Sequence, residues 1–379
     1  MNIAIIGTGF VADYYMTTLV NHPQLVLCGV YDHDAVRLKQ FADHYKVATY
    51  PDFAAILADE KVSIVVNLTT PENHYALSRQ ALEAGKHVYC EKPLAMRYEE
   101  AAELVAIAEQ RNLTLTSAPA NALSPAHQLV ARTITEEHVG TPRLVYAQME
   151  DGPVFRADWQ SWRSVSGARW PGLHEFEIGC TLEHAGYALS WLVTLFGPVT
   201  SLTAFAALTF PDKGRGTESI AMAPDFSVAC LEFRSGVIAR LTCGLAAPRD
   251  RSLTILGDSG TLTVSDLWHH HSPVYLETTR QGRSLRTRLA ERLETQLKRF
   301  LHGKPLPGRR LACKAKPVKL PAYPSQIDFA GGVAAQADAI ERGGPLVSSG
   351  RIALHITELA LALNNARTLP QPYKLQSTF

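Results

Sequence analysis

The sequence predicts an α/β protein made of two domains. At 379 residues the chain is longer than one hydrophobic core usually supports, so two cores are expected. Up to residue 120 or so, apolar strand patterns alternate with helical patterns. After Ser124-Pro125 the pattern changes to strands separated by turn residues such as Gly257-Asp258-Ser259-Gly260. The change places a domain boundary near residue 122.

The N-terminal part, residues 1–122, alternates strands and helices in order along the chain. The predicted strands are Ile3–Ile6, Leu25–Tyr31, Ile64–Leu68, His87–Cys90 and Leu113–Ser117. Helices such as Glu72–Ala84 and Tyr98–Arg111 lie between them. This alternation predicts a parallel sheet that is covered by helices on both faces.

The first strand runs directly into a glycine-rich turn and then a helix. The motif Gly7-Thr8-Gly9-Phe10-Val11-Ala12 fits the dinucleotide pattern G-x-G-x-x-A. Gly7 permits the tight turn, Gly9 lets bare backbone approach a pyrophosphate, and the helix N-terminus offers unpaired N–H groups to the phosphates. We therefore predict a Rossmann domain over residues 1–122, with Gly7, Thr8, Gly9, Phe10 and Val11 at the cofactor.

A carboxylate follows the second predicted strand. Asp32 lies about twenty residues after the glycines, where a carboxylate contacts the adenosine ribose hydroxyls. It would repel a 2′-phosphate, and neither His33 nor Asp34 supplies a fixed positive charge. Arg37, about one helical turn further on, is the exception. The sequence predicts NAD as the cofactor, with NADP less favoured.

Polar residues also follow the third and fourth predicted strands. Ligands of open α/β sheets bind beyond the carboxyl ends of the strands. The cofactor residues predicted there are Thr69, Pro71, Asn73, His74, Glu91 and Lys92. His74 could instead cap or pack the helix. A lysine at the mouth of a buried sheet is partly desolvated, so Lys92 is also a candidate for proton transfer or substrate orientation.

The C-terminal part, residues 123–379, is predicted to be an α+β domain with a large, open, mostly antiparallel sheet. Its predicted strands are Leu144–Glu150, Val199–Phe210, Ser227–Phe233, Val237–Gly244, Ser252–Leu256 and Thr261–Val264. Two helices, Gln326–Arg342 and Ile352–Ala366, are predicted to follow.

Composition excludes several classes of function. A net charge of +1 gives no reason to expect nucleic acid or a membrane surface as partner, and no apolar run approaches the roughly 18 residues of a spanning helix. The first strand begins at residue 3, which leaves no room for a signal peptide. Six widely spaced cysteines favour buried free thiols in a reducing cytoplasm. His269-His270-His271 lacks further ligands at suitable spacing, so no metal is predicted.

A basic stretch from Arg280 to Lys319 holds thirteen Lys or Arg residues and two glutamates. Its first half has helical spacing and its second half is rich in proline. Three interpretations stand: a solvated helical face, a subunit contact, or an edge that meets an anionic substrate.

Together these motifs resemble the Gfo/Idh/MocA oxidoreductases. The resemblance rests on the glycine motif, Asp32, residues 69–74, the closing helix around residues 353–361 and above all residues 84–95 with Glu91-Lys92-Pro93. It implies a Rossmann domain, a C-terminal open-sheet domain, a nicotinamide cofactor and a polyhydroxylated substrate. It also implies that Lys92 is catalytic and that the sheet mediates a homodimer or homotetramer.

The family usually carries D-x-x-x-H on a helix of the second domain. A gapless count back from Phe196-Gly197 puts Glu183 at the Asp position and Tyr187 at the His position, and residues four apart share one helical face. A one-residue shift would instead bring in His184, whose imidazole titrates near neutrality. We predict Tyr187 as the acid/base, with the nearby Lys92 lowering its pKa, and keep Glu183 and His184 as catalytic candidates.

Three residues are predicted to bind substrate. Trp162-Arg163 resembles the family's Trp-Arg substrate segment, and aromatic faces and guanidinium groups suit sugars. Asn121 lies in the run 120–123, which departs from the family's Asn-Arg-Arg-Phe. The sequence thus predicts an NAD(P)-dependent dehydrogenase acting on a secondary hydroxyl of a sugar, sugar acid or cyclitol. The alternatives are an NAD-dependent, redox-assisted glycosidase or lyase and a non-catalytic dinucleotide-binding regulator.

Overall fold

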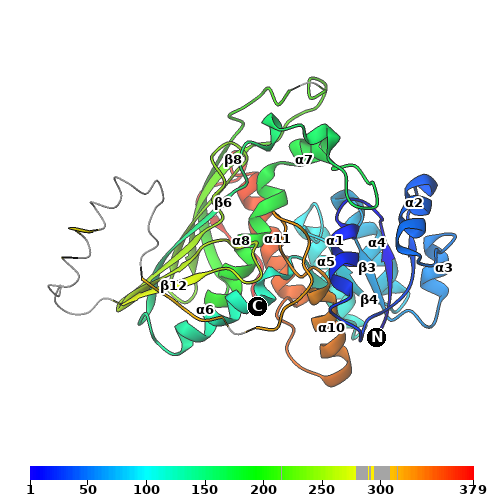
Figure 1. The fold of residues 1–379 in the computed structure, drawn as a ribbon, viewed down its shortest axis with the longest axis horizontal. Helices are drawn as coiled ribbons and strands as arrows, with labels where there is room; N and C mark the ends of the chain where they lie inside the picture. Colours follow the sequence, from blue (N-terminus) through cyan, green and yellow to red (C-terminus); the bar gives the residue numbers. More distant parts are fainter. Residues whose placement is uncertain (215, 279–288, 290–291, 294–307, 314) are drawn as a thin grey trace.

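The computed structural model describes residues 1–214, 216–278, 289, 292–293, 308–313 and 315–379. They form two sheets with helices packed on them, and the sheets follow each other along the long axis of the molecule (Figure 1). Helices α8 (Cys180–Phe196) and α11 (Gly350–Asn364) lie between the two sheets in this view.

Within the described residues, the N-terminal sheet has five strands, all parallel, in the order β2-β1-β3-β4-β5. The strands are β1 (Asn2–Ile6), β2 (Val26–Tyr31), β3 (Ile64–Asn67), β4 (His87–Cys90) and β5 (Leu115–Ser117). The helices between and after them are α1 (Ala12–Leu19), α2 (Ala35–Tyr45), α3 (Phe53–Ala58), α4 (Pro71–Glu83) and α5 (Tyr98–Gln110). Ile3 and Ile5 of β1 belong to one core, whereas Ala4 and Ile6 belong to another, so the sheet is buried on both faces. The predicted parallel sheet is confirmed.

Nine strands form the C-terminal sheet in the part of the chain that the structure describes, in the order β13-β12-β11-β10-β6-β9-β8-β7-β14. They are β6 (Pro142–Glu150), β7 (Val199–Ala207), β8 (Phe226–Phe233), β9 (Ile238–Gly244), β10 (Leu253–Gly257), β11 (Gly260–Val264), β12 (Val274–Thr278), β13 (Arg309–Arg310) and β14 (Tyr373–Lys374). The sheet is mostly antiparallel, as predicted. The exception is that β6 pairs with β9 in parallel, with Leu144 beside Ile238. Strand β12, which the sequence analysis did not predict, extends the sheet beyond β11.

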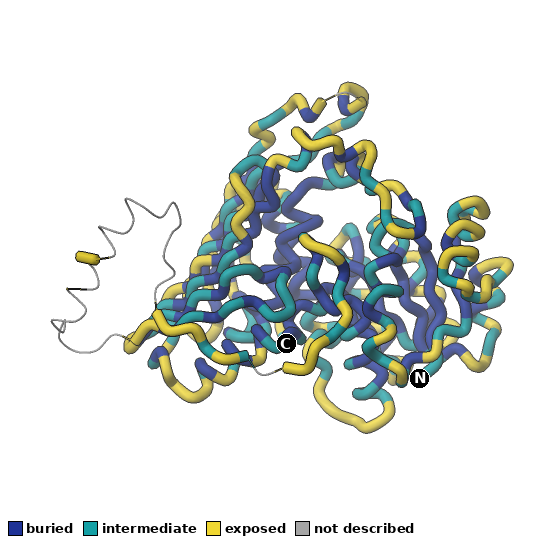
Figure 2. The backbone as a smooth tube through the Cα atoms, in the orientation of Figure 1, coloured by how far each residue is buried: buried dark blue, intermediate teal, exposed yellow. Residues whose placement is uncertain are grey.

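Helix α8 lies across one face of this sheet and follows the short helix α7 (Gly172–Ile178). Nearly all of its residues are buried, because the sheet covers one side of α8 and α11 covers another. On the strands, large hydrophobic side chains remain 39 to 54% exposed at Leu144, Tyr146, Phe205 and Ile238. Figure 2 shows buried, intermediate and exposed residues mixed along the strands of this sheet.

The last two long helices, α10 (Ala330–Arg342) and α11, pack on the N-terminal part of the chain. The Gln336 amide Nε2 donates to Val88 O of β4 at 3.0 Å. Leu94 N donates to Thr357 Oγ1 of α11 at 3.2 Å. The change from one sheet to the other falls between β5 and β6, where the short helices η1 (Ala120–Leu123) and α6 (Pro125–Thr135) lie. Helix α11 also contacts β7 and β8, so it packs on both sheets, whereas α10 contacts β4 and β5 of the first sheet.

No described helix is long and apolar enough to cross a membrane. Among the cysteines, which are free thiols, Cys90, Cys180 and Cys243 are buried. Cys230 is exposed, so the prediction of buried thiols is wrong for that residue.

Most of the basic stretch from Arg280 to Lys319, including most of its predicted helical half, lies outside the described residues.

Candidate active site

The glycine turn after β1 has the geometry that a dinucleotide requires. Gly7 has φ +88°, and a Cβ there would lie 2.6 Å from Leu68 O, so no other residue fits. At Gly9 a Cβ would meet nothing within 4 Å, which leaves open space above the turn. The N-terminus of α1 follows at once, and Phe10 packs edge-on against Tyr14 at 5.7 Å between ring centroids. These residues fit a pyrophosphate at the turn.

Asp32 is buried beneath this turn at the end of β2. Its Oδ2 accepts hydrogen bonds from Thr8 N at 2.8 Å and Thr8 Oγ1 at 3.0 Å. Arg37, from the first turn of α2, donates to both carboxylate oxygens at 2.8 and 2.6 Å. Although burial raises it, the hydrogen bonds from Arg37, Thr8 and Asp34 hold the pKa of Asp32 below its ordinary value. The carboxylate is therefore fixed and ionised.

Of the residues predicted to bind the cofactor after β3, some are accessible and one, His74, is buried. Pro71 begins α4, and Asn73 is exposed, where its amide donates to Thr70 Oγ1 at 3.0 Å. Thr69 donates to Asn67 Oδ1 at 2.6 Å. His74 is fully buried, and its ring nitrogens lie 2.7 Å from Pro93 O and 3.0 Å from Thr69 O. His74 thus joins the ends of β3 and β4, which is the packing alternative.

Glu91 supports the turn that carries Lys92. Tyr15 of α1 donates to Glu91 Oε1 at 2.7 Å, and Lys92 N donates to Glu91 Oε2 at 3.1 Å. Both carboxylate oxygens are therefore used within the protein. Glu91 connects the helix after the glycine turn to the end of β4.

Lys92 meets helix α8 across the boundary between the two sheets. Its Nζ forms an ion pair with Glu183 Oε2 and lies 5.8 Å from the centroid of the Tyr187 ring. Although burial lowers it, Glu183, Tyr187 and Glu91 raise the pKa of Lys92, so the ammonium stays charged. Burial raises the pKa of Glu183, but Lys92 outweighs it and holds that pKa below its usual value. The register that put Glu183 and Tyr187 on one helical face agrees with these contacts.

The pKa of Tyr187 differs from the sequence prediction. Lys92 does lower it, but burial raises it more, and the carboxylates Glu91, Glu183 and Glu175 raise it further. The predicted net lowering is wrong, because the sequence does not reveal how deeply the phenol is buried. Glu175 of α7 is a further member of this cluster: burial, and then Glu183, raise its pKa well above the ordinary value. The phenol and this carboxyl therefore favour their protonated forms at neutral pH.

His184 lies beside Asp151 and Trp268, whereas Lys92 pairs with Glu183. Its Nε2 lies 4.0 Å from Asp151 Oδ2, and its ring packs edge-on against Trp268 at 5.6 Å between centroids. Burial lowers the pKa of His184, so the ring is neutral at neutral pH. Tyr187 contacts the same indole at 4.6 Å. Trp268 thus packs against both candidate bases.

Asn121 holds Tyr187 in place rather than facing outward. It is buried, and its amide donates to Tyr187 O at 2.8 Å and to Leu267 O at 3.1 Å, while Ser190 Oγ donates to its Oδ1 at 2.9 Å. Because its hydrogen bonds are internal, we assign Asn121 to positioning and not to the predicted substrate contact.

The loop that carries Trp162 and Arg163 spans residues 157–171. Trp162 packs on Trp170 at 5.0 Å between centroids, and Arg163 Nη1 donates to backbone carbonyls of its own loop. Ser166 of this loop donates to both oxygens of Asp13 in α1, at 3.0 Å from N and 2.7 Å from Oγ. The loop is therefore tied to the helix that follows the glycine turn.

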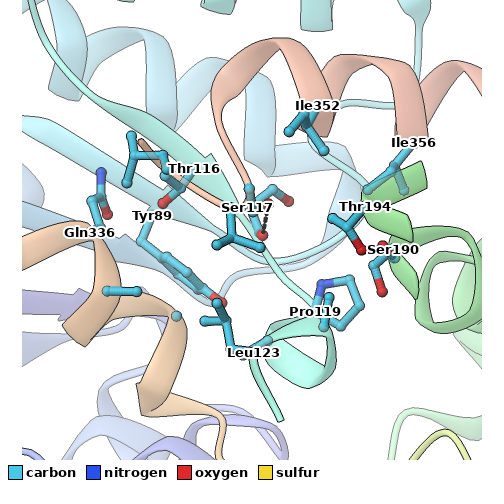
Figure 3. A pocket seen from close by; sticks show the side chains of 17 residues that line it. Tyr89, Thr116, Ser117, Pro119, Leu123, Ser190, Thr194, Gln336, Ile352 and Ile356 are labelled. Atoms are coloured by element: carbon cyan, nitrogen blue, oxygen red, sulfur yellow. Dashed lines mark hydrogen bonds between the residues drawn. The ribbon is translucent and has the colours of Figure 1, made fainter. Parts of the chain in front are cut away.

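A small cavity lies between β5, η1, α8, α10 and α11 (Figure 3). Tyr89, Thr116, Ser190 and Gln336 line it, together with apolar side chains. Its volume of about 20 Å³ has room for a water molecule but not for a sugar or a nucleotide. It is not the candidate active site.

Two parts of the chain match models of one family. Residues 1–118 match an oxidoreductase family with an NAD-binding Rossmann fold, and residues 127–263 match the GFO/IDH/MocA C-terminal domain. The chain belongs to the Gfo/Idh/MocA oxidoreductase family. Its N-terminal domain is an NAD-binding Rossmann domain, and the resemblance inferred from the sequence is confirmed.

Two of the named relatives are dehydrogenases of sugar-type compounds. The chain is 30% identical over 228 residues to UDP-N-acetylglucosamine 3-dehydrogenase of Acidithiobacillus ferrooxidans, which covers 56% of this chain and 69% of that protein. It is 28% identical over 273 residues to D-apiose dehydrogenase of Paraburkholderia graminis. That match covers 69% of this chain and 67% of the relative. The fold matches the WlbA dehydrogenase of Bordetella pertussis, solved with NADH and UDP-GlcNAcA, with a TM-score of 0.70 at 18% identity over 99% and 98% of the two chains.

Sequence reasoning did not identify Asp151, Glu175 or Trp268 as parts of this site. They come from the end of β6, from α7 and from the segment after β11, and no local motif marks them. The one signal is a pair of carboxylates where β6 ends: Glu150 is its last residue and Asp151 follows it.

Proposed function

We propose that this chain is an NAD-dependent dehydrogenase that transfers a hydride between nicotinamide and a secondary hydroxyl or keto group of a sugar, sugar acid or cyclitol. One observation carries the proposal: Lys92, at the end of β4, pairs with Glu183 on α8, one helical turn from Tyr187. A substrate held at this pair lies between the nucleotide-binding sheet and the C-terminal sheet. The two sugar dehydrogenases among the relatives support the substrate class.

In this proposal Tyr187 is the acid/base and Lys92 the electrostatic partner. The raised pKa keeps the phenol protonated, so it can donate to a substrate carbonyl during reduction and must lose that proton for oxidation. The charged Lys92 stabilises the alkoxide that develops on the substrate oxygen. Glu183 keeps Lys92 charged and in position.

The cofactor is proposed to bind across the carboxyl ends of β1, β2 and β3. Gly7 to Val11 and the N-terminus of α1 would hold the pyrophosphate, and Asp32 the adenosine ribose. Thr69 and Asn73 would lie along the nicotinamide side. Bound NAD supplies the hydride acceptor that no side chain can provide.

We also propose that copies of this chain associate through the C-terminal sheet. Leu144 pairs with Ile238 across β6 and β9, and both side chains are 39% exposed. Beside them, Tyr146 lies under Arg240 at 4.9 Å. Exposed apolar side chains on neighbouring strands favour burial against a second copy.

The proposed reaction is tested by adding NAD to the purified chain with neutral sugars, inositols and uronic acids and following NADH formation. At least one of these compounds should reduce NAD. Hydrolysis or elimination of a glycoside without net NADH would instead support the redox-assisted glycosidase or lyase. Tight NAD binding without turnover of any compound, including glycosides, would support the regulator.

A further inference from the structure

We propose that Asp151 and His184, beside Trp268, form a hydroxyl-binding subsite that selects an uncharged polyhydroxylated substrate over a sugar acid. This inference rests on the proposed dehydrogenase function and narrows its substrate class. Asp151 directly follows β6, and His184 lies on α8 between Glu183 and Tyr187.

The two side chains are close but do not contact each other. Asp151 Oδ2 and His184 Nε2 are 4.0 Å apart, which is too long for a hydrogen bond. Their side chains are 12% and 9% exposed, so both are almost enclosed yet reachable. A hydroxyl group placed between them can donate to the carboxylate and accept from an imidazole N–H.

Asp151 is held in place by charge. Arg251 Nη1 lies 3.7 Å from its Oδ1, and Arg249 Nε lies 3.8 Å from the same oxygen. Arg251 is itself fixed, because its Nη2 donates to Asp266 Oδ2 at 2.8 Å and its guanidinium lies 4.4 Å from the Trp268 ring centroid. Arg251 therefore positions the carboxylate from behind and is not available to bind a substrate.

Several polar atoms of this cluster are buried without a hydrogen-bond partner in the described part of the chain: Asp151 Oδ1, His184 Nδ1, Trp268 Nε1 and Arg251 Nε and Nη1. Leaving a buried polar group unsatisfied costs about 1–3 kcal/mol. A purely structural cluster would gain by replacing such groups with apolar ones. The two atoms that face each other, Asp151 Oδ2 and His184 Nε2, are not among these enclosed atoms, so they are the ones that a ligand hydroxyl can reach.

The charge of the site favours an uncharged ligand. Lys92 already pairs with Glu183, and Arg249 and Arg251 already lie against Asp151, so each of these cations is next to a carboxylate of the protein. Asp151 and Glu183 are among the groups that raise the pKa of Glu175, so these carboxyl groups lie close enough to repel one another. A substrate carboxylate would meet the same repulsion, whereas a hydroxyl would donate to Asp151.

The test compares matched neutral and acidic probes, D-glucose with D-glucuronate and D-galactose with D-galacturonate, alongside myo-inositol. Wild-type protein should oxidise a neutral probe with the higher kcat/KM. In Asp151→Asn the KM for that probe should rise about tenfold or more with kcat changed far less, since a hydrogen bond to a charged acceptor is lost. The preference for the neutral member of the pair should fall by a similar factor.

Asp158→Asn is the matched control, because Asp158 is exposed and lies in the same segment. It should leave KM and the preference unchanged. If Asp151→Asn does not fold by circular dichroism, His184→Gln takes its place, with the same expected rise in KM. A wild-type preference for the acidic probe, or an unchanged KM in the folded variant, overturns the inference.

Calorimetric titration of the NAD-loaded protein separates this inference from the proposed reaction. Neutral probes should bind wild type at least tenfold more tightly than Asp151→Asn. Binding of this kind without NADH formation would sustain the subsite and refute the dehydrogenase. NADH formation with equal binding by both proteins, or no binding of any neutral probe, would refute the subsite.

Discussion

Arg37 holds Asp32 through two hydrogen bonds, from Nε to Oδ2 at 2.8 Å and from Nη2 to Oδ1 at 2.6 Å. The two groups are five residues apart, and Arg37 is partly exposed while Asp32 is buried. This forked geometry is the strong form of an arginine–carboxylate contact. In the proposed complex a ribose hydroxyl would share Asp32 with a guanidinium that is itself suited to a 2′-phosphate.

The first prediction is that the chain binds NAD(H) more tightly than NADP(H) and that Asp32→Ala reverses or removes this preference. Removing the carboxylate takes away the repulsion of a 2′-phosphate and frees Arg37 to bind it. The ratio of the two dissociation constants should move by about tenfold to a hundredfold toward NADP(H). Fluorescence titration measures both constants. Lys39→Ala, on an exposed pair with Asp43 in the same helix, should leave the ratio unchanged.

The second prediction concerns Lys92→Ala, which should lose turnover by about a hundredfold or more while still binding NAD. It should also be less stable, because the ion pair with Glu183 is largely buried and Glu183 would be left unpaired. The double variant Lys92→Ala/Glu183→Gln should regain much of that stability without regaining turnover. Steady-state rates and denaturant melts measure the two effects. Lys61→Ala, at an exposed lysine, is the control and should leave both the rate and the stability unchanged. Near-normal rates in Lys92→Ala would remove Lys92 from the mechanism.

The third prediction separates the two candidate bases. Tyr187→Phe should lower kcat by about a hundredfold or more, whereas His184→Ala should act mainly on KM. Both variants should bind NAD normally, since the proposal assigns the pyrophosphate to the glycine turn and the adenosine ribose to Asp32, not to these side chains. The opposite result, with turnover kept by Tyr187→Phe and lost by His184→Ala, would identify His184 as the base.

The pH profile provides an independent check on that assignment. Because the pKa of Tyr187 is raised, oxidation by wild type should keep accelerating above pH 8, by up to about tenfold per unit. Reduction should be nearly constant from pH 6 to 8, since the phenol stays protonated. A base at His184, whose pKa is lowered, would instead give an oxidation rate that levels off below pH 7.

The fourth prediction is that the folded protein loses stability in mild acid because His355 of α11 becomes protonated on unfolding. Its Nε2 accepts a hydrogen bond from Val199 N at 3.0 Å, so this nitrogen must be unprotonated, and burial lowers its pKa to about 4. The unfolded chain binds the proton near pH 6.5, so stability is present above that pH and falls as the pH drops toward 4. The expected loss from this residue between pH 7 and pH 5 is about 2 kcal/mol.

Urea melts at the two pH values measure that loss. His355→Gln keeps an acceptor for Val199 N–H but does not titrate, so its stability should depend less steeply on pH than that of wild type. His138→Gln, at an exposed histidine, should follow wild type. Equal slopes for wild type and His355→Gln would contradict the prediction.

Much of the N-terminal half could be predicted from the sequence because its signals are local. Gly7, Asp32 and Lys92 each mark the end of a strand, and parallel strands bring those ends to one edge. The spacing of Glu183 and Tyr187 likewise placed both on one face of α8. Residues that meet only through long-range packing gave no such signal.

The pairing of β6 with β9 in parallel and the approach of Asp151 to His184 bring together segments far apart in the chain. The direction of the Tyr187 pKa shift depended on burial, which the sequence pattern did not reveal. The role of Asn121 also depended on surroundings that the sequence does not show. Its residue type suits a sugar, but its surroundings commit the amide to Tyr187 and Leu267 backbone.

The return of α10 and α11 to the first sheet bears on how the protein is synthesised. The nucleotide-binding strands leave the ribosome first, but Gln336 and Thr357, which bond to β4 and to the segment after it, leave 248 and 263 residues after their partners Val88 and Leu94. In the interval the surface around Tyr89, where Gly332 packs too closely for any larger residue, has no cover. The N-terminal half is thus an incomplete folding unit until the chain is nearly finished, and a fragment that ends near residue 122 would expose an apolar surface and aggregate.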